Sequence, residues 1–290
     1  MIEVKNLSKT FTTFSGTVTA LNNVSLSIPE GCCTVIGGEN GSGKSVLVSI
    51  LAGLETQDAG EIIFDLEKTE ASSVSNNNAD NQKLVPSTNN YSENQEASSS
   101  KKTRFNNRLP KKDGPQNPVG LVFQEAETQI LGETPREDIA FGPKNQGRSK
   151  EEIQAAVENA LNKTSLSQKA DFPARFLSGG EKRRLAVACM LAMEKPVIIL
   201  DEPYANLDFT GVKQVNALIS ELKKDGKTVV ILTHEIEKCL ALTDRFIVLF
   251  RGNKVFDDSP QKALEQPEKL ENWNIRNPFQ SYDSLKDLLW

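Results

Sequence analysis

The chain has 290 residues, 38% hydrophobic and 25% charged, which is typical of globular proteins and unlike disordered, collagen-like or disulfide-scaffold chains. Its net charge of -5 argues against a general nucleic-acid-binding protein, because such proteins carry basic surfaces. The longest apolar run, residues 185–193, is far shorter than the roughly 18 to 20 residues of a membrane-spanning helix. The N-terminus has no apolar secretory segment. We therefore expect a cytoplasmic protein without a membrane span.

In chain order, the pattern predicts strands that alternate with helices. A strand over residues 32–38 is followed by a helix whose apolar residues are Leu47, Ile50, Leu51 and Leu54. Later come a helix over about 180–193, a buried strand over 196–202, a helix over about 211–224 and a buried strand over 227–234. This alternation predicts an α/β fold with a largely parallel sheet.

Residues 68–117 differ from the rest of the chain in composition. They are rich in Ser and Asn, poor in hydrophobic residues and interrupted by Pro and Gly, so they cannot bury enough apolar surface to offset the entropy of ordering. We interpret them as a low-complexity, disordered insertion. Its second half is basic, which has two possible interpretations. It contacts an anionic lipid or partner, or it is a loop whose charge only keeps it soluble.

The sequence GENGSGKS, residues 38–45, matches the phosphate-binding pattern G-x-x-x-x-G-K-[ST] and lies between the first strand and the first helix. In such a loop, backbone N–H groups surround the α- and β-phosphates of a nucleotide, and the helix N-terminus adds its positive end. Lys44 is expected to reach the β- and γ-phosphates, and Ser45 to bind Mg²⁺. The residues predicted here to bind the nucleotide, which the resemblance described below identifies as ATP, are Gly38, Asn40, Gly41, Ser42, Gly43, Lys44 and Ser45.

A second group of candidate functional residues, two adjacent carboxylates, stands at the end of the strand over 196–202. Asp201 is expected to hold Mg²⁺, directly or through water, and Glu202 to act as the general base on the attacking water. The alternative is a pair of solvated charges at a strand end, but adjacent like charges after a buried strand favour the catalytic role. His234, the only histidine, follows the next buried strand, from which it could contact the γ-phosphate and orient the water.

The run LSGGE at residues 177–181 resembles the signature of ATP-binding cassette (ABC) ATPases, and the phosphate loop, signature, ILDEP, Asp208 and His234 occur in that family's order. The resemblance covers residues 1–67 and 118–255. It implies a P-loop NTPase domain of ABC type, with a RecA-like core, an antiparallel β subdomain and a helical signature subdomain. It further implies that two ATPase domains enclose two ATP molecules.

The resemblance also assigns residue roles. Phe11, or alternatively Phe14, would stack on adenine, Gln124 would be the Q-loop glutamine that senses magnesium and the membrane partner, and Asp208 would close the D-loop. Ser178, Gly179, Gly180 and Glu181 would act on the ATP of the opposite subunit, since helix N-terminal N–H groups can face an anion.

A narrower resemblance, to the energy-coupling factor (ECF) ATPases, rests on residues 119–129, 137–143 and 273–279. It implies uptake of a vitamin or transition-metal ion, with a second ABC ATPase, homo- or heterodimeric, and integral membrane scaffold and substrate-binding subunits. The protein would lie on the cytoplasmic face of the membrane. On this basis we expect an ABC domain over 1–255 and a short C-terminal extension over 256–290. Two alternatives remain. One is the ATPase of an exporter or a lipid transporter, and the other is a soluble ABC ATPase that works on nucleic acid or on the ribosome.

Overall fold

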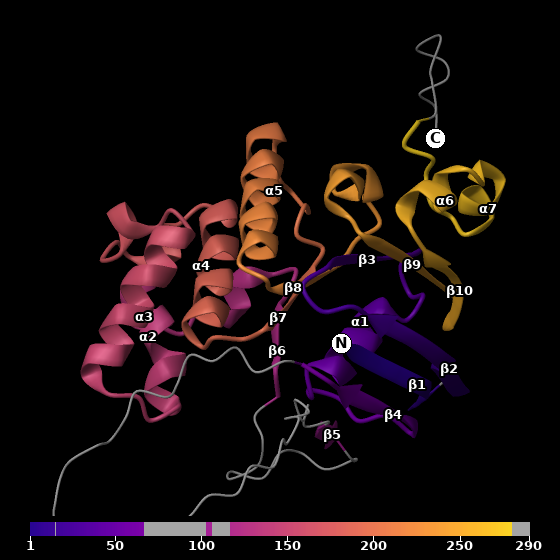
Figure 1. Cartoon of the computed structure of the whole chain (residues 1–290), viewed down its shortest axis with the longest axis horizontal. Helices are drawn as coiled ribbons and strands as arrows, with labels where there is room; N and C mark the ends of the chain where they lie inside the picture. Colours follow the sequence, from indigo (N-terminus) through magenta and orange to yellow (C-terminus); the bar gives the residue numbers. More distant parts are fainter. Residues whose placement is uncertain (15, 67–102, 106–116, 280–290) are drawn as a thin grey trace, which may run out of the picture.

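The computed structural model describes residues 1–14, 16–66, 103–105 and 117–279, and these residues form two sheets with helices packed around them (Figure 1). Most of the predicted insertion therefore lies outside the described residues. Within the described ranges, no helix is both long and apolar enough to cross a membrane. The predicted α/β class is confirmed.

The larger sheet is six-stranded, in the order β10-β9-β3-β8-β7-β6. Every pairing in it is parallel except that of β10 with β9. Its inner strands are short apolar runs buried on both faces, as expected for a parallel sheet covered on each side. The strands are β3 (Cys33–Gly37), β6 (Val119–Val122), β7 (Val197–Asp201), β8 (Thr228–Leu232), β9 (Arg245–Phe250) and β10 (Asn253–Asp258).

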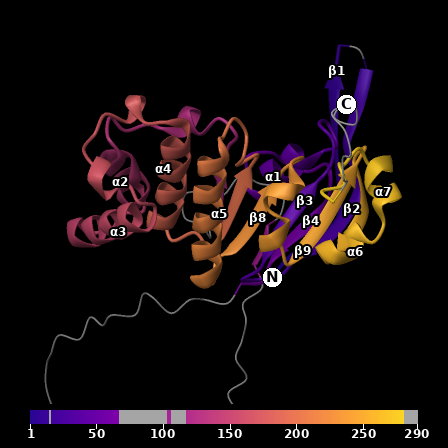
Figure 2. The ribbon, with the colours of Figure 1, turned by 90° about the horizontal axis from the view of Figure 1, so that it is seen from above.

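The smaller sheet is antiparallel, in the order β2-β1-β4-β5, and its first two strands form a long hairpin (Figure 2). Its strands are β1 (Ile2–Thr13), β2 (Gly16–Ile28), β4 (Ala59–Phe64) and β5 (Thr103–Phe105). Strand β5 lies within the segment 68–117 that we interpreted as a low-complexity insertion, and it pairs with β4 from Ile62 to Phe64. The composition of that segment does not indicate this strand, which forms through backbone pairing with a sheet edge.

Helices cover both faces of the large sheet. Helix α1 (Lys44–Leu51) packs with the small sheet on one face, and α5 (Phe209–Lys224) packs on the other. Alternate residues of β7 and β8 contribute to the two cores, as the period of two in a strand requires. The prediction that Leu54 belongs to the first helix is wrong. The helix ends at Leu51, and Leu54 is 59% exposed.

A separate helical layer stands beside the sheet edge formed by β6 (Figure 1). It consists of α2 (Pro135–Asn145), α3 (Lys150–Lys163) and α4 (Gly179–Ala192), which share a core of their own around Ile139, Leu161 and Leu185. Short 3₁₀ turns connect the larger elements, namely η1 (Ala126–Gln129), η2 (Ser167–Lys169), η3 (Ala174–Phe176), η4 (Ile236–Lys238) and η5 (Leu240–Leu242).

The C-terminal part of the described chain packs on the main domain. Helices α6 (Pro260–Leu264) and α7 (Pro267–Asn272) place Ala263 and Leu270 in the same core as α5. The boundary that we expected at residue 255 falls inside β10, so the start of the extension is a strand of the large sheet.

Candidate functional site

Adjacent parallel strands bring several predicted site residues together at the carboxyl ends of the strands of the large sheet. The registers pair Ile36 of β3 with Leu232 of β8, Asp201 of β7 with Leu232, and Val122 of β6 with Leu200. The phosphate loop, His234, Glu202 and Gln124 therefore all follow the carboxyl ends of neighbouring parallel strands. Such an edge is where α/β sheets bind ligands.

The loop between β3 and α1 is tightly folded. Gly38 has φ +142°, and a Cβ atom there would come within 2.1 Å of the Leu249 carbonyl oxygen, so only glycine fits. The Ser42 hydroxyl is buried without a hydrogen-bond partner among the described residues. Nζ of Lys44 donates to the carbonyl oxygens of Gly38 at 2.7 Å and Glu39 at 3.0 Å. The loop thus holds a cation and an unused hydroxyl, a set that fits an anionic phosphate.

Lys44 and Asp201 lie in a partly dehydrated environment. Burial lowers the pKa of Lys44, although the nearby carboxylates of Glu202, Asp201 and Glu39 oppose this effect. Burial, together with the charge of Glu202, raises the pKa of Asp201, against the opposing effects of Lys44 and a hydrogen bond with Ser45. The contact between the Ser45 hydroxyl and the Asp201 carboxylate brings together two oxygen ligands of the kind that Mg²⁺ prefers.

Glu202 and His234 form a hydrogen-bonded pair. Oε1 of Glu202 lies 2.9 Å from Nδ1 of His234. The Glu202 backbone has φ +44°, which is uncommon for a residue with a side chain. Its other carboxylate oxygen, Oε2, is buried without a partner among the described residues. This free oxygen is available to accept a proton from a water molecule.

Gln124 and Phe11 lie at the margins of this site. Gln124 is exposed, its carbonyl oxygen accepts from Nη2 of Arg183 at 3.3 Å, and it lines a cavity of about 180 Å³ with Gly179 and the turn at residues 205–207. Phe11 lies directly across the hairpin from Val18, and Nζ of Lys9 is 5.1 Å from its ring centre. Phe14 is fully exposed close to the hairpin tip.

The predicted signature residues begin helix α4. Ser178 is the N-cap, and it exchanges hydrogen bonds with Glu181 in a capping box. Glu181 is also ion-paired with Lys169, so its carboxylate supports the helix start. A Cβ atom at Gly179 would meet no atom within 4 Å. The start of α4 therefore carries two small residues, Gly179 and Gly180, with open space beside the Gly179 backbone.

Asp208 caps the next helix. Its Oδ1 accepts from the Gly211 amide at 2.7 Å, so the predicted D-loop runs directly into α5. The turn before it contains Asn206 at φ +57°.

Two features of the site were not predicted from the sequence. Arg183 is buried in α4 with Nε and Nη1 lacking partners among the described residues, and the sequence contains only an Arg-Arg pair as a hint. Asn274, far along the chain, donates to the Glu39 carboxylate in the phosphate loop. No local sequence signal connects two residues so far apart.

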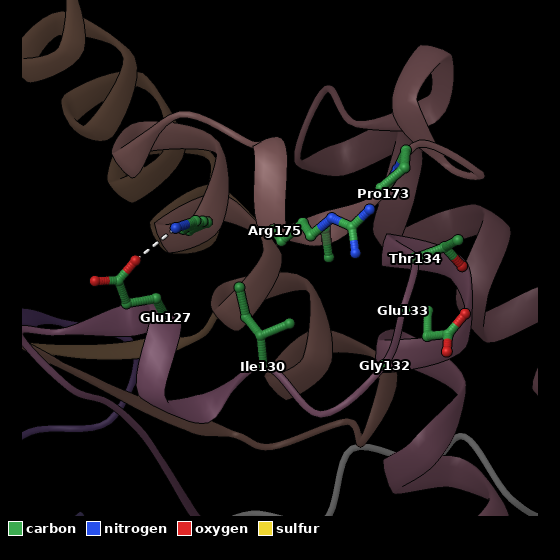
Figure 3. Close-up of a pocket in the computed structure, with 9 residues that line it drawn as sticks. Glu127, Ile130, Gly132, Glu133, Thr134, Pro173 and Arg175 are labelled. Atoms are coloured by element: carbon green, nitrogen blue, oxygen red, sulfur yellow. Dashed lines mark hydrogen bonds and ion pairs between the residues drawn. The ribbon is translucent and has the colours of Figure 1, made fainter.

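A wider hollow lies beside the Gln124 segment. It has a volume of about 610 Å³ and is lined by η1, the start of α2 and the turn before α4. Figure 3 shows Ile130, Thr134 and Arg175 around this hollow, with Glu127 ion-paired to Lys182 at its edge.

Comparison with known proteins places this geometry in a family. The model of the family described as ABC transporter matches residues 21–205. Over 96% of its length, the chain is 32% identical to an energy-coupling factor transporter ATP-binding protein, EcfA2, of Methanospirillum hungatei, of which it spans 60%. It is also 35% identical to the cobalt import ATP-binding protein CbiO of Rhodobacter capsulatus, over 92% of this chain and 82% of that one.

Solved structures agree with these relatives. The cbiO1 protein of Clostridium perfringens, described as part of the ABC transporter complex cbiONQ, superposes with a TM-score of 0.68 at 28% identity, covering 96% of this chain and 95% of that one. A dimeric ATP-binding cassette, MJ0796, bound to ADP and Pi, has a TM-score of 0.65 at 27% identity, with coverages of 89% and 98%. The chain therefore belongs to the ABC transporter family of ATP-binding subunits, and it is an ATPase.

Proposed function

We propose that the chain is the ATP-hydrolysing energy subunit of an ECF-type importer for a vitamin or a transition-metal ion. The observation that carries this proposal is the convergence of the Gly38–Ser45 loop, Asp201, Glu202 and His234 at one sheet edge. The importer assignment is supported by the relatives named for energy coupling and cobalt import. The chain would work at the cytoplasmic face of the membrane.

The geometry supports a different role for each group of residues in the site. Backbone N–H groups of the loop and Lys44 bind the triphosphate, and Phe11 stacks on adenine. Ser45 and Asp201, with Gln124 approaching from β6, would hold Mg²⁺. Magnesium supplies charge neutralisation at the β- and γ-phosphates. Glu202 accepts the proton of the attacking water, and His234 holds the carboxylate through Nδ1.

One chain presents only half of each such site. Gly179 and Gly180 begin α4, and the N–H groups of this helix start would meet the γ-phosphate bound by a second ATPase subunit. The dimeric relative bound to ADP and Pi supports this arrangement. The second subunit is either another copy of this chain or a related ATPase.

Integral membrane subunits would contact the surface around η1 and α2. The large hollow there is lined by Glu127, Ile130, Thr134 and Arg175, which together offer an apolar floor and both signs of charge. Gln124 precedes the η1 side of this hollow and also contacts α4, through a shared cavity and through Arg183. A shift of the η1 segment on contact with a membrane subunit would therefore be transmitted to Gln124.

The experiment is gentle purification from membranes with identification of the proteins that accompany the chain. We expect a second ATPase, one integral scaffold protein and a small membrane protein that binds the substrate. Arg175→Glu should lose the membrane proteins, whereas Lys224→Glu, an equal charge reversal at an exposed residue at the end of α5, should retain them. Recovery of an exporter, or of ribosomes or DNA, would contradict the proposal.

A further inference from the structure

The C-terminal segment reaches the phosphate-binding loop. Nδ2 of Asn274 donates a hydrogen bond to Oε2 of Glu39 at 2.6 Å, across 235 residues of sequence. In Figure 1 the helices α6 and α7, which lead to Asn274, lie beside β9. The loop that we assign to ATP is therefore contacted by a residue outside the segment matched by the family model.

Asn274 is held rigidly between two packed residues. The Trp273 ring lies 5.9 Å from the ring of Phe256, and Ile275 is buried. The Ile275 amide donates to the Leu270 carbonyl at 2.8 Å, which closes the turn after α7. Asn274 itself has φ +56°, a conformation that Asn tolerates better than most residues. Its side chain is thus presented to Glu39 by a fixed backbone.

The ring of Trp273 is the first of three aromatic rings, Trp273, Phe256 and Phe246, that lead from the C-terminal segment to the start of the phosphate loop. Phe256 is 6.1 Å from Phe246, ring centre to ring centre. A Cβ atom at Gly37, the last residue of β3, would lie 2.9 Å from the Phe246 ring, so ring and backbone are in direct contact. The C-terminal segment therefore meets the start of the loop twice, through an apolar contact chain and through the Asn274 amide.

Glu39 is well placed to transmit this contact. Its carbonyl oxygen accepts from Nζ of Lys44 at 3.0 Å and from the Ser42 amide at 3.2 Å. The Glu39 carboxylate is therefore carried by the same residue whose backbone holds the Lys44 amine. A carboxylate free to turn toward Lys44 would compete with phosphate for the amine and repel the triphosphate.

We propose that Asn274 is a positioning residue for the ATP-binding loop, which fixes the Glu39 carboxylate at the rim and keeps Lys44 available to phosphate. Residues 273–275 are then part of the nucleotide site. The inference rests on the proposed role of residues 38–45 in binding the triphosphate. It assigns this role to a C-terminal segment that lies outside residues 21–205, which the family model matches.

The test substitutes Asn274 with residues that remove or reverse its hydrogen bond to Glu39, and measures nucleotide binding by the full chain. Asn274→Gly keeps the backbone conformation and removes the amide, and Asn274→Asp places a carboxylate against Glu39. Affinity is measured by calorimetry with Mg²⁺ and the non-hydrolysable analogue AMP-PNP, and KM and kcat are measured with ATP. We expect a loss of affinity of about fivefold for Asn274→Gly and more than about tenfold for Asn274→Asp, with kcat within about twofold.

Rescue distinguishes positioning from a general structural effect. In the double variant Glu39→Gln with Asn274→Asp, the hydrogen bond is re-formed with reversed polarity, and affinity should return to within about twofold of the original. The control is Asn277→Asp, because the Asn277 side chain accepts from the Phe279 amide and tolerates a carboxylate. We expect this control to bind AMP-PNP normally.

Unchanged affinity in Asn274→Asp, an equal loss in Asn277→Asp, or an additive loss in the double variant would overturn the inference. These affinities require no membrane subunit. A chain that shows the predicted pattern but recovers no importer proteins would support the inference and contradict the proposed function.

Discussion

Nδ1 of His234 and Oε1 of Glu202 are 2.9 Å apart, which joins the ends of two neighbouring strands in one hydrogen-bonded pair. The members of the pair differ in exposure, since the His234 side chain is 55% exposed and that of Glu202 only 9%. The imidazole therefore lies on the open side of a carboxylate whose second oxygen is buried. A pair of this kind should act as a single unit.

The first prediction is non-additivity between these two residues. Glu202→Gln should slow single-turnover ATP hydrolysis by about 100- to 10,000-fold, because the amide cannot accept a proton. His234→Ala should slow it by about 100-fold, and adding it to Glu202→Gln should have little further effect. Glu237→Gln, on the exposed turn η4, is the matched control and should hydrolyse ATP normally. Near-normal rates in both single variants would contradict the site assignment.

A second prediction concerns pH and Asp201. Burial raises the pKa of this carboxyl above its ordinary value of 3.8, so between the unfolded and folded pKa values the folded state binds more protons. The free energy of unfolding therefore falls as pH rises through that window and stays lower above it. Asp201→Asn lacks this titration, so without nucleotide it should melt at a higher temperature than the original chain at pH 7.

The same substitution should weaken function. Removing the charge of Asp201, which we propose as a Mg²⁺ ligand, is expected to lower Mg²⁺-dependent hydrolysis by about 10- to 100-fold. Asp171→Asn, at an exposed carboxylate of the helical layer, should change neither the melting temperature in this direction nor the rate. A lower melting temperature in Asp201→Asn would show that the carboxylate is net stabilising.

The sequence predicted those parts of the site that are encoded locally. A buried strand followed by GENGSGKS or by Asp-Glu predicts both the element and the residue types at its end, and parallel pairing then brings the strand ends together. This explains why the convergence of Glu202 and His234 could be anticipated from the order of their strands.

Features that depend on distant partners could not be predicted in this way. Strand β5 has three residues and exists through pairing with β4, and the Asn274 contact joins segments 235 residues apart. Leu54 has the right spacing for the first helix, but Gly53 at φ +73° follows the helix end and turns the chain away. In each case tertiary contacts or backbone geometry override the local pattern.

A third prediction tests the fold of the phosphate loop. At Gly38, alanine would place its Cβ 2.1 Å from a backbone oxygen at φ +142°, so Gly38→Ala should cost at least about 3 kcal/mol of unfolding free energy in urea titrations. Gly147→Ala is the control, because Gly147 also has a positive φ but open space around it. Its cost should be about 1–2 kcal/mol. Equal losses would show that the close approach at Gly38 relaxes easily.

The last prediction separates the structural role of Ser178 from its role toward ATP. Ser178→Asp keeps a good N-cap for α4, so the free energy of unfolding should change by less than about 0.5 kcal/mol. The new carboxylate would nevertheless face the phosphate of the second subunit, and like charges repel there. ATP-driven association of two ATPase domains and steady-state hydrolysis should both fall by at least about tenfold.

Helix α3 provides a matched control for this change, because Ser149 and Glu152 form the same capping box that Ser178 and Glu181 form in α4. Ser149→Asp should leave stability, association and hydrolysis unchanged, as measured by urea unfolding, light scattering with Mg²⁺-ATP and phosphate release. If Ser178→Asp behaves like Ser149→Asp in all three measurements, the start of α4 does not face nucleotide. If it loses activity while remaining folded, the exposed N–H groups of α4 belong to a site that two subunits share.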